Sequence, residues 1–422
     1  MKKTSTYLLI FLFGLFIPAI LLFDAAGHVN LQSFIALLGG TGAFSLMALN
    51  LFLAARPAFA ERLLGGLDKL YVVHKWVGIS ALVFMLVHEN VGMDLEGNIV
   101  STGLAKLSVD VAEIIYPVML VLILISFIKR FPRISYQIPY HWWRWSHRVL
   151  GVLFMGIFFH QFFVKAPFDA NTPISLYLNI VGLVGIFSFL YTEFFAPWRA
   201  KSYEIVDIEK HPAATLITAK AKNKPISSQA GGFAIISINR NGLREPHPFT
   251  ISGRPEENLI QFSIRGLGDY TRRLPELAQV GDTMSIRGGY GRFDYLDGED
   301  QQLWIAGGIG ITPFLAFADT LDESLNKRIH LVYSVRTEQE ALGLERFESA
   351  AQRCKNFSYS LQVSEQSGHL TAEKLLELNE GDMDKTGLWF CGPIPMRVAL
   401  LDGLEKLNRQ PASVHFEQFE FR

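Results

Sequence analysis

Six apolar stretches in the first half of the chain constrain its fold more than any other feature. Each is long enough, or nearly so, to cross a bilayer as a helix, which takes about 20 apolar residues. The stretches cover residues 7–23, 33–55, 71–87, 109–128, 142–164 and 174–197. They predict a bundle of six transmembrane helices over residues 1–198.

The first stretch also has one feature of a signal peptide, because it follows Lys2 and Lys3. Its apolar run is long, however, and Asp24-Ala25-Ala26 makes a poor cleavage site. We therefore expect a transmembrane helix here, with a signal peptide as the alternative.

Lysine and arginine residues are concentrated in alternate connections between these stretches. One set holds Lys2, Lys3, Arg56, Arg62, Lys69, Lys75, Lys129, Arg130, Arg133, Arg144, Arg148, Arg199 and Lys201, and the other holds only Lys106 and Lys165. Cytoplasmic loops retain positive charge, so both termini are expected in the cytosol. The short loops and compact domains favour a bacterial inner (plasma) membrane protein.

The second half of the chain has the mixed charge and the Gly/Pro punctuation of a globular protein. A net charge of -1 and the absence of a basic stripe give no reason to expect nucleic acid as a partner. Both cysteines, Cys354 and Cys391, lie in this half. Two cysteines do not indicate a disulfide framework, so a reducing compartment fits.

Histidines within the apolar stretches are the most informative residues of the first half, because ionisable groups at membrane depth are costly. Fourteen residues separate His74 from His88 in the third stretch, and thirteen separate His147 from His160 in the fifth. These spacings place the members of each pair roughly 20 Å apart along a helix. His74 is level with His147 and His88 with His160, so each level can supply both axial ligands of a haem iron.

Three features of this reading have more than one explanation. An interhelical hydrogen bond explains any one of these histidines taken alone. Thirteen residues also place the second histidine roughly 140° away from the first around an ideal helix, so the fifth helix must be distorted or present two faces. Gly78, Gly151 and Gly156 on the same two helices permit close approach of a macrocycle, or ordinary helix packing.

Short runs rich in β-branched and aromatic residues begin after the last apolar stretch. The runs at 203–208, 214–219, 232–238 and 259–265 predict a small antiparallel β-barrel over residues 199–299. Strand-like runs at 303–306, 328–333 and 387–390 alternate with helical patterns. This alternation predicts a parallel α/β sheet over residues 300–422.

Several short motifs in the second half suggest cofactor chemistry. Gly307-Gly308-Ile309-Gly310-Ile311-Thr312-Pro313 lies at a strand-to-helix junction, where backbone N–H groups can receive a pyrophosphate. A bare tight turn is the alternative for this motif alone. The barrel adds His247-Pro248-Phe249-Thr250 and Arg265-Gly266-Leu267-Gly268-Asp269-Tyr270-Thr271, and the last region adds Phe390-Cys391-Gly392-Pro393 and His415-Phe416-Glu417-Gln418-Phe419.

Together these motifs resemble the ferredoxin-NADP reductase superfamily, over essentially all of residues 200–422. With six apolar stretches and paired histidines, the whole chain resembles the NADPH oxidase and ferric reductase family. This resemblance implies a six-helix bis-haem transmembrane bundle, a β-barrel that binds FAD and an α/β domain that binds NADPH.

By this likeness, the flavin ring and ribityl chain contact His247, Pro248, Phe249 and Thr250. The FAD pyrophosphate and nearby groups contact Arg265, Gly268, Tyr270 and Thr271, and a guanidinium suits phosphate oxygens. The nicotinamide cofactor's phosphates contact Gly308, Gly310, Thr312 and Pro313. Cys391, Gly392 and Pro393 border the nicotinamide, although Cys391 is also explained as a small buried residue and is not expected to be a nucleophile. Phe419 matches the aromatic of the family's C-terminal Glu-x-Phe pattern and stacks near the flavin, with Phe416 and Phe421 as alternatives.

Ser334 and Arg336 follow a strand where the family recognises the adenosine ribose. A cation there favours a 2′-phosphate, so NADPH is preferred over NADH. The implied activity is electron transfer from cytosolic NADPH through FAD and two b-type haems to an acceptor on the outer side.

Bis-histidine ligation leaves iron with no open position, so the acceptor is expected to react at the haem edge. Oxygen, giving superoxide, is the favoured acceptor. A ferric chelate and a periplasmic redox partner are the alternatives. Animal oxidases typically carry a polar residue one turn beyond the outer ligand of the third helix, whereas this chain has Gly92.

Overall fold

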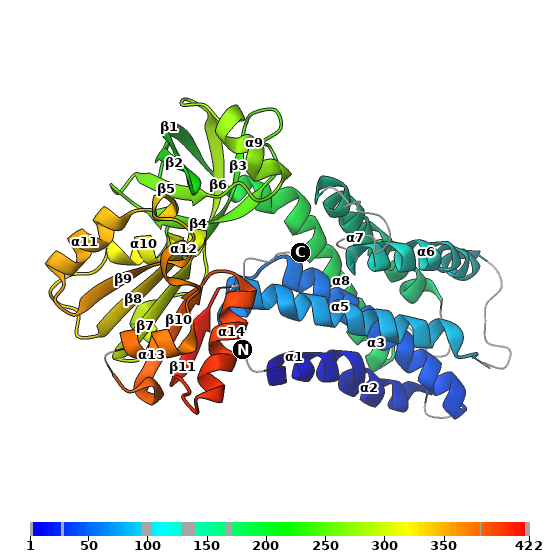
Figure 1. Cartoon of the computed structure of the whole chain (residues 1–422). Coiled ribbons are helices and arrows are strands. Elements are labelled where there is room, and N and C mark those ends of the chain that lie inside the picture. Colours follow the sequence, from blue (N-terminus) through cyan, green and yellow to red (C-terminus); the bar gives the residue numbers. More distant parts are fainter. Residues whose placement is uncertain are drawn as a thin grey trace. The chain divides into compact units, whose positions relative to one another are not determined.

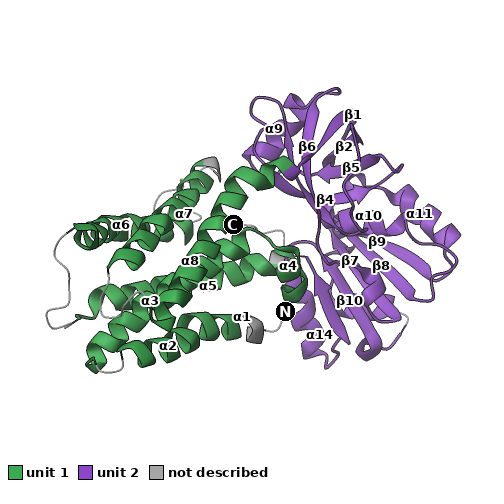
Figure 2. Cartoon of the chain, turned by 180° about the vertical axis from the view of Figure 1, so that it is seen from behind, with its two compact units in different colours: residues 1–198, 420–422 green, residues 199–419 purple. Residues whose placement is uncertain are grey.

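The computed structural model describes residues 3–26, 29–93, 103–127, 140–164, 171–379 and 381–417 of the chain (Figure 1). The chain divides into two compact units, Met1–Trp198 and Arg199–Phe419 (Figure 2). The first unit is helical, and the second combines a β-barrel with a parallel sheet.

The first unit consists of long helices joined by short connections. Its elements are α1 (Lys3–Ile10), η1 (Phe11–Phe16), α2 (Ile17–Ala26), α3 (Leu31–Ala54), α4 (Ala58–Leu64), α5 (Leu67–Asn90), α6 (Gly103–Phe127), α7 (Tyr140–Phe163), α8 (Pro173–Leu190), η2 (Tyr191–Phe195) and η3 (Ala196–Arg199). Within the described residues, α1, η1 and α2 follow one another without a break.

Five helical segments in the described part of the chain are long and apolar enough to cross a membrane. They are Thr6–Ala26, Leu31–Ala54, Lys69–Asn90, Gly103–Phe127 and Pro173–Arg199. The sixth predicted span forms α7, which has 24 residues and therefore sufficient length. It is less apolar because it contains Arg144 and Arg148 as well as His147 and His160, so the prediction of six spans is confirmed for five.

Close packing in the first unit depends on small residues at helix contacts. The most buried of the five spans, α3, packs against α5 and α8, and α6 packs against α7. Gly182 and Gly185 on α8 lie against Phe158 and Phe154 of α7, with no space for a side chain. Small residues let helix backbones approach where lipid gives no hydrophobic driving force for association.

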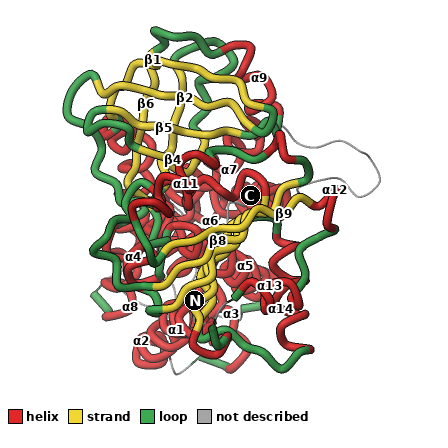
Figure 3. The backbone as a smooth tube through the Cα atoms, turned by 60° about the vertical axis from the view of Figure 1, so that its left-hand side comes forward, coloured by secondary structure: helices red, strands yellow, loops and turns green. Residues whose placement is uncertain are grey.

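The second unit begins with a closed antiparallel barrel, as the strand-like runs predict. Its strands follow the order β1-β2-β5-β4-β3-β6 around the barrel, and Figure 3 shows β1, β2, β5 and β6 side by side. They are β1 (Lys201–His211), β2 (Ala214–Ala221), β3 (Phe233–Ile238), β4 (His247–Gly253), β5 (Leu259–Ile264) and β6 (Thr283–Tyr290). The helix α9 (Asp269–Leu277) connects β5 to β6.

A five-stranded parallel sheet follows, in the order β11-β10-β7-β8-β9. The strands are β7 (Gln301–Gly307), β8 (Arg328–Val335), β9 (Phe357–Val363), β10 (Thr386–Cys391) and β11 (Ser413–Phe416). The connecting elements are η4 (Tyr295–Asp297), η5 (Gly308–Ile311), α10 (Thr312–Ala318), η6 (Glu338–Glu340), α11 (Leu344–Arg353), α12 (Ser364–Ser367), α13 (Ala372–Leu378), η7 (Met383–Lys385) and α14 (Ile394–Lys406). The predicted parallel α/β sheet is therefore confirmed.

Helices cover both faces of this sheet, and its strands β7 and β10 are therefore buried along almost their whole length. On one face, Trp304 of β7 packs with Phe314 and Phe317 of α10 and Phe347 of α11. On the other face, the core is formed with residues of α13 and α14.

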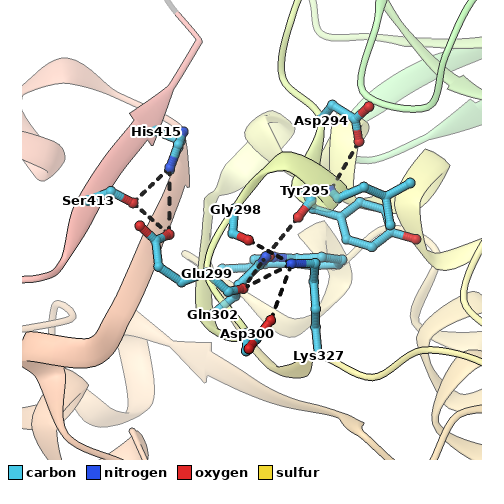
Figure 4. Close-up of polar contacts among 11 residues, drawn as sticks. Asp294, Tyr295, Gly298, Glu299, Asp300, Gln302, Lys327, Ser413 and His415 are labelled. Atoms are coloured by element: carbon cyan, nitrogen blue, oxygen red, sulfur yellow. Dashed lines mark hydrogen bonds and ion pairs between the residues drawn. The ribbon is translucent and has the colours of Figure 1, made fainter.

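A polar turn fixes the amino-terminal end of β7 (Figure 4). Gln302 Nε2 donates to the carbonyls of Tyr295 at 2.7 Å and Glu299 at 2.9 Å. Lys327 Nζ donates to the carbonyl of Gly298 at 2.6 Å. Ser413 at the start of β11 donates to the Glu299 carboxylate at 2.7 Å, so the same turn holds the edge strand.

Arg346 of α11 joins the barrel to the sheet within the second unit. Its guanidinium donates to the carbonyl of Ser252 on β4 at 2.8 Å and to the carbonyl of Leu315 on α10 at 3.0 Å. It also pairs with Asp319 just after α10. Because α10 packs directly against β4, this arginine ties together the strand that carries His247 and the helix that follows the glycine turn.

Candidate functional site

Two backbone turns meet at the carboxyl ends of the neighbouring strands β7 and β10. A side chain on Gly310 would collide with the backbone carbonyl of Cys391. A β-carbon on Gly392 would lie 3.0 Å from the backbone of Gly307, so these two glycines also pack backbone to backbone. Gly308 has φ +55, a conformation that glycine adopts at low cost. In parallel α/β sheets, ligands bind outside the carboxyl ends of the strands, so these turns border a candidate nucleotide site.

The other residues predicted at this turn have different surroundings. Thr312 and Pro313 begin α10 and are buried, as is all of that short helix. Their side chains support the turn in this structure, and a direct contact with a phosphate remains a prediction. Pro393 lies beside Gly307, and its ring leaves no space for a side chain at position 307.

Ser334 and Arg336 extend this edge along β8. Ser334 is half-buried and lies opposite Gly307 in the sheet register. Arg336 is 70% exposed and pairs with Glu340 at 3.4 Å and Glu365 at 3.8 Å. The sequence alone did not indicate that two carboxylates share this guanidinium.

Three aromatic rings, two from β4 and one from α9, lie together where the flavin is predicted to bind. The rings of His247 and Tyr270 have centroids 4.2 Å apart, and Phe249 lies 6.4 Å from each of them. Tyr270 is buried and its hydroxyl donates to the carbonyl of Leu243 at 3.3 Å. Burial, and then the Glu245 carboxylate, raise the pKa of this tyrosine, so it stays neutral.

Burial divides the four predicted flavin-contact residues of β4. His247, Pro248 and Phe249 are half-buried, whereas Thr250 is buried. The first three therefore retain accessible surface for a flat ring, and the contact of Thr250 with the ribityl chain stays a prediction.

The loop between β5 and α9 is the predicted pyrophosphate site. Residues 265–269 are exposed. Thr271 Oγ1 accepts hydrogen bonds from the backbone N–H groups of Leu267 and Gly268, both at 2.9 Å, and thereby shapes the loop. Arg265 reaches from this loop to the glycine turn, since its guanidinium lies 3.2 Å from the position of a β-carbon on Gly308. The flavin loop and the nucleotide turn are thus neighbours, with a cation between them.

A carboxylate joins the predicted hydride-transfer site near Cys391. Cys391 is completely buried, and burial, followed by the charge of Glu417, raises the pKa of its thiol. The thiol therefore stays protonated, as expected for a residue that is not a nucleophile. Glu417 Oε1 also lies 3.4 Å from the position of a β-carbon on Gly291, at the end of the barrel. Phe419 lies outside the described residues.

The family motifs indicate no role for Glu417, although it lies in the same C-terminal segment as Phe419. The feature of the sequence that could have indicated Glu417 is a carboxylate directly after the edge strand β11.

All four membrane histidines have their Nδ1 atom in a hydrogen bond to a neighbouring helix. His74 Nδ1 lies 3.2 Å from the carbonyl of Asn50 and His88 Nδ1 2.9 Å from the carbonyl of Ala36, both on α3. His160 Nδ1 lies 3.1 Å from the carbonyl of Ser108, and His147 Nδ1 lies 2.9 Å from Ser126 Oγ, both on α6.

These bonds decide which ring nitrogen can bind a metal. A carbonyl oxygen only accepts, so Nδ1 of His74, His88 and His160 must carry the proton. Nε2 is then the unprotonated nitrogen, and among the described residues it has no hydrogen-bond partner in any of the four rings. Metal-bound histidines typically donate their other ring N–H in this way. The donor set therefore fits haem iron.

The pairing of the histidines agrees with their predicted levels. The ring centroids of His74 and His147 lie 6.0 Å apart. This distance accommodates one metal ion between two rings, because imidazole–metal bonds are about 2 Å long. His88 lies close enough to His160 for an electrostatic interaction. The described residues contain no cluster of three or more His, Cys, Asp or Glu side chains suited to a metal.

The two open questions about the fifth helix and the glycines receive structural answers. Both histidines of α7 contact α6, and α7 is α-helical from Tyr140 to Phe163. Gly151 lies against Phe189 and Gly156 against Ile115, as in ordinary helix packing. Gly78 lies against the side chain of Asn50, the residue whose carbonyl holds His74.

Comparisons with known families match three consecutive parts of the chain. Residues 39–158 match the family described as "Ferric reductase like transmembrane component". Residues 201–293 match "FAD-binding domain", and residues 304–400 match "Oxidoreductase NAD-binding domain". The chain has the architecture of the NADPH oxidase and ferric reductase family. Its cofactor-binding modules are therefore those of a membrane oxidoreductase.

Curated relatives are similar to this chain over only part of their own length. The electron transfer component of toluate 1,2-dioxygenase from Pseudomonas putida is 29% identical over 44% of this chain and 57% of the relative. Dual oxidase 2 from Rattus norvegicus is 31% identical over 32% of this chain and 10% of the relative. The chain thus spans little more than half of the toluate component. Among solved structures, a flavohemoglobin from Malassezia yamatoensis has 16% identity and a TM-score of 0.49 over 93% of this chain and 99% of that one.

Proposed function

We propose that this chain carries electrons from cytosolic NAD(P)H through FAD and two b-type haems to an acceptor on the far side of a membrane. The observation that carries the proposal is the state of the four membrane histidines, each with Nδ1 bonded and Nε2 available. The FAD-binding and NAD-binding modules of the same chain support it.

Residues of the chain would form three kinds of site, for FAD, for the dinucleotide and for haem. In the second unit, Arg265 and the exposed loop after β5 would hold the FAD phosphates, with His247 and Phe249 beside the flavin ring. The turns at Gly308, Gly310 and Gly392 would receive the dinucleotide. Because glycine has no side chain, the dinucleotide could come close to the protein backbone there. FAD, when bound, supplies the conversion from hydride to single electrons.

In the first unit, the proposed ligands of one haem are His74 and His147, and those of the other are His88 and His160. Within each helix the two histidines are roughly 20 Å apart, which suits one site near each membrane surface. The positive residues of alternate connections support cytosolic termini, and we propose a bacterial inner membrane as the location.

Oxygen, giving superoxide, is the acceptor we propose. Ligation by two histidines would leave no open position on iron, so a small diffusible acceptor could react at the haem edge without a further binding site. The match to a ferric reductase transmembrane family favours a ferric chelate as the second candidate.

Stepwise spectroscopy of the detergent-purified chain, supplied with FAD and NADPH, tests the proposal. Haem absorbance is recorded first without oxygen, and air is then admitted with a superoxide-specific probe. Haem reduction followed by superoxide in proportion to the NADPH consumed is the expected result. If the haems are reoxidised slowly in air but quickly by a ferric chelate, the chain is a ferric reductase. A chain that takes up no haem would refute the proposal.

A further inference from the structure

Two serines on α6 stand beside the two histidines of α7 but use different atoms. Ser126 contacts His147 Nδ1 through its hydroxyl at 2.9 Å. Ser108 contacts His160 Nδ1 through its backbone carbonyl at 3.1 Å. The serines lie about five full turns apart, on the same face of the helix. Only one histidine of the four is therefore held by a side chain.

The hydrogen-bond direction at Ser126 follows from its other partner. Its hydroxyl donates to the carbonyl of Leu122 at 2.7 Å, which uses its only hydrogen. The oxygen must then accept from His147 Nδ1, so His147 has the same tautomer as the other three histidines. Ser108 also donates its hydroxyl backward, to the carbonyl of Ala105 at 2.7 Å, but that hydroxyl does not touch a histidine.

Trp143, one turn before His147 on α7, strengthens the same arrangement. Its indole N–H donates to the carbonyl of Ser126 at 3.3 Å. Its ring stacks on the His147 imidazole with centroids 5.3 Å apart and an interplanar angle of 7°. Ser126 thus holds the imidazole directly through its hydroxyl and indirectly through the tryptophan that stacks on it.

We infer that Ser126 is a positioning residue for His147 and that its hydroxyl sets the reduction potential of the haem bound by His74 and His147. The inference rests on the proposed function, because it requires haem at this pair. A hydrogen bond accepted from Nδ1–H makes Nε2 more basic and orients the ring. A more basic axial ligand favours ferric iron, so loss of the bond raises the potential of that haem alone.

Replacement of Ser126 by alanine in the full chain tests this inference. Redox titration of haem absorbance should give one midpoint potential that is more positive than in the wild type and one that is unchanged. Affinity for haem at the altered site should fall roughly 10–100-fold, as for other partners of metal-bound histidines. The ferric electron paramagnetic resonance spectrum should change for one haem only. Ser126→Thr, which keeps a hydroxyl, should restore the wild-type values.

Ser108→Ala is the matched control, because the carbonyl that holds His160 remains. It should leave both potentials unchanged. Should Ser126→Ala fail to fold, Trp143→Phe keeps an aromatic ring beside His147 but removes the N–H that reaches Ser126. A smaller upward shift of the same potential is then expected.

Two results overturn the inference while the proposed function stands. One is a Ser126→Ala protein with two haems and unchanged potentials and spectra. The other is an equal shift of the midpoint potential in Ser126→Ala and Ser108→Ala, which would show that any such change in α6 alters the potential. A wild-type chain without haem overturns the proposed function, and the inference with it.

Discussion

The α-carbon of Gly310 lies directly against the backbone carbonyl of Cys391, with no space for a β-carbon between them. Because these residues stand just beyond β7 and at the end of β10, the contact fixes how closely the two turns of the candidate nucleotide site approach. A single side-chain atom at Gly310 would have to push the turns apart.

Gly310→Ala is therefore expected to weaken dinucleotide binding and to destabilise the second unit by about 1–3 kcal/mol, as overpacking does. The measurements are the KM for NADPH in flavin reduction and the thermal unfolding temperature. Gly266→Ala is the control for unfolding, since the nearest atom to its β-carbon would lie at 3.7 Å. An unchanged KM in Gly310→Ala would contradict the placement of the dinucleotide at this turn.

The choice between NADPH and NADH is expected to depend on Glu340 and Glu365 as much as on Arg336. Both carboxylates lie within 4 Å of the guanidinium and would repel a 2′-phosphate. Changing both to glutamine should raise the ratio of kcat/KM for NADPH to that for NADH by roughly tenfold, or about 1.4 kcal/mol.

Arg336→Gln is the complementary variant. It should lower kcat/KM for NADPH far more than for NADH, because only the phosphorylated cofactor needs the cation. Equal losses for both cofactors would remove Arg336 from the ribose site.

Arg346 is expected to support hydride transfer from a distance, because it joins β4 of the barrel to α10 of the sheet. Arg346→Met should destabilise the second unit by about 2 kcal/mol, since hydrogen bonds from a charged group are lost. It should also slow flavin reduction while FAD stays bound.

Arg353→Met is the matched control for this prediction. Arg353 contacts Ser349 and the carbonyl of Ala318, which lie on the sheet side only. Stopped-flow flavin reduction and thermal unfolding would separate the two variants. Identical behaviour would show that the link to the barrel does not matter.

Cys391 should be chemically inert and should contribute to alkaline sensitivity. Its thiol pKa is raised in the folded chain by burial and by Glu417. Stability from this group is complete below the unfolded pKa of about 8.5 and is lost as the pH rises above it, because only the unfolded chain ionises there.

Cys391→Ser should therefore reduce the loss of stability between neutral and alkaline pH, measured by unfolding at several pH values. Flavin reduction by the wild type should show no ionisation of this thiol near neutrality, and alkylating reagents should not modify it in the folded protein. Rapid alkylation of Cys391 would contradict its burial.

The sequence by itself determined the classes of structure, because they follow from local periodicity. Long apolar runs need a membrane or a core, and short β-branched runs between turn residues need sheets. The barrel and the parallel sheet were predictable in this way, as were five of the apolar spans. The sixth predicted span, at α7, is not among the five because Arg144 and Arg148 within it lower its hydropathy.

Only the tertiary structure decided which atoms meet, because those contacts join residues far apart in the chain. Spacing predicted four histidines at two levels. The partner that sets each tautomer, such as Ala36 for His88, depends on how α3 packs against α5 and how α6 packs against α7. The carboxylates around Arg336 and the approach of Glu417 to Cys391 arise from the same cause. Side-chain chemistry is local, but hydrogen bonds and electrostatic fields act across space between segments that packing brings together.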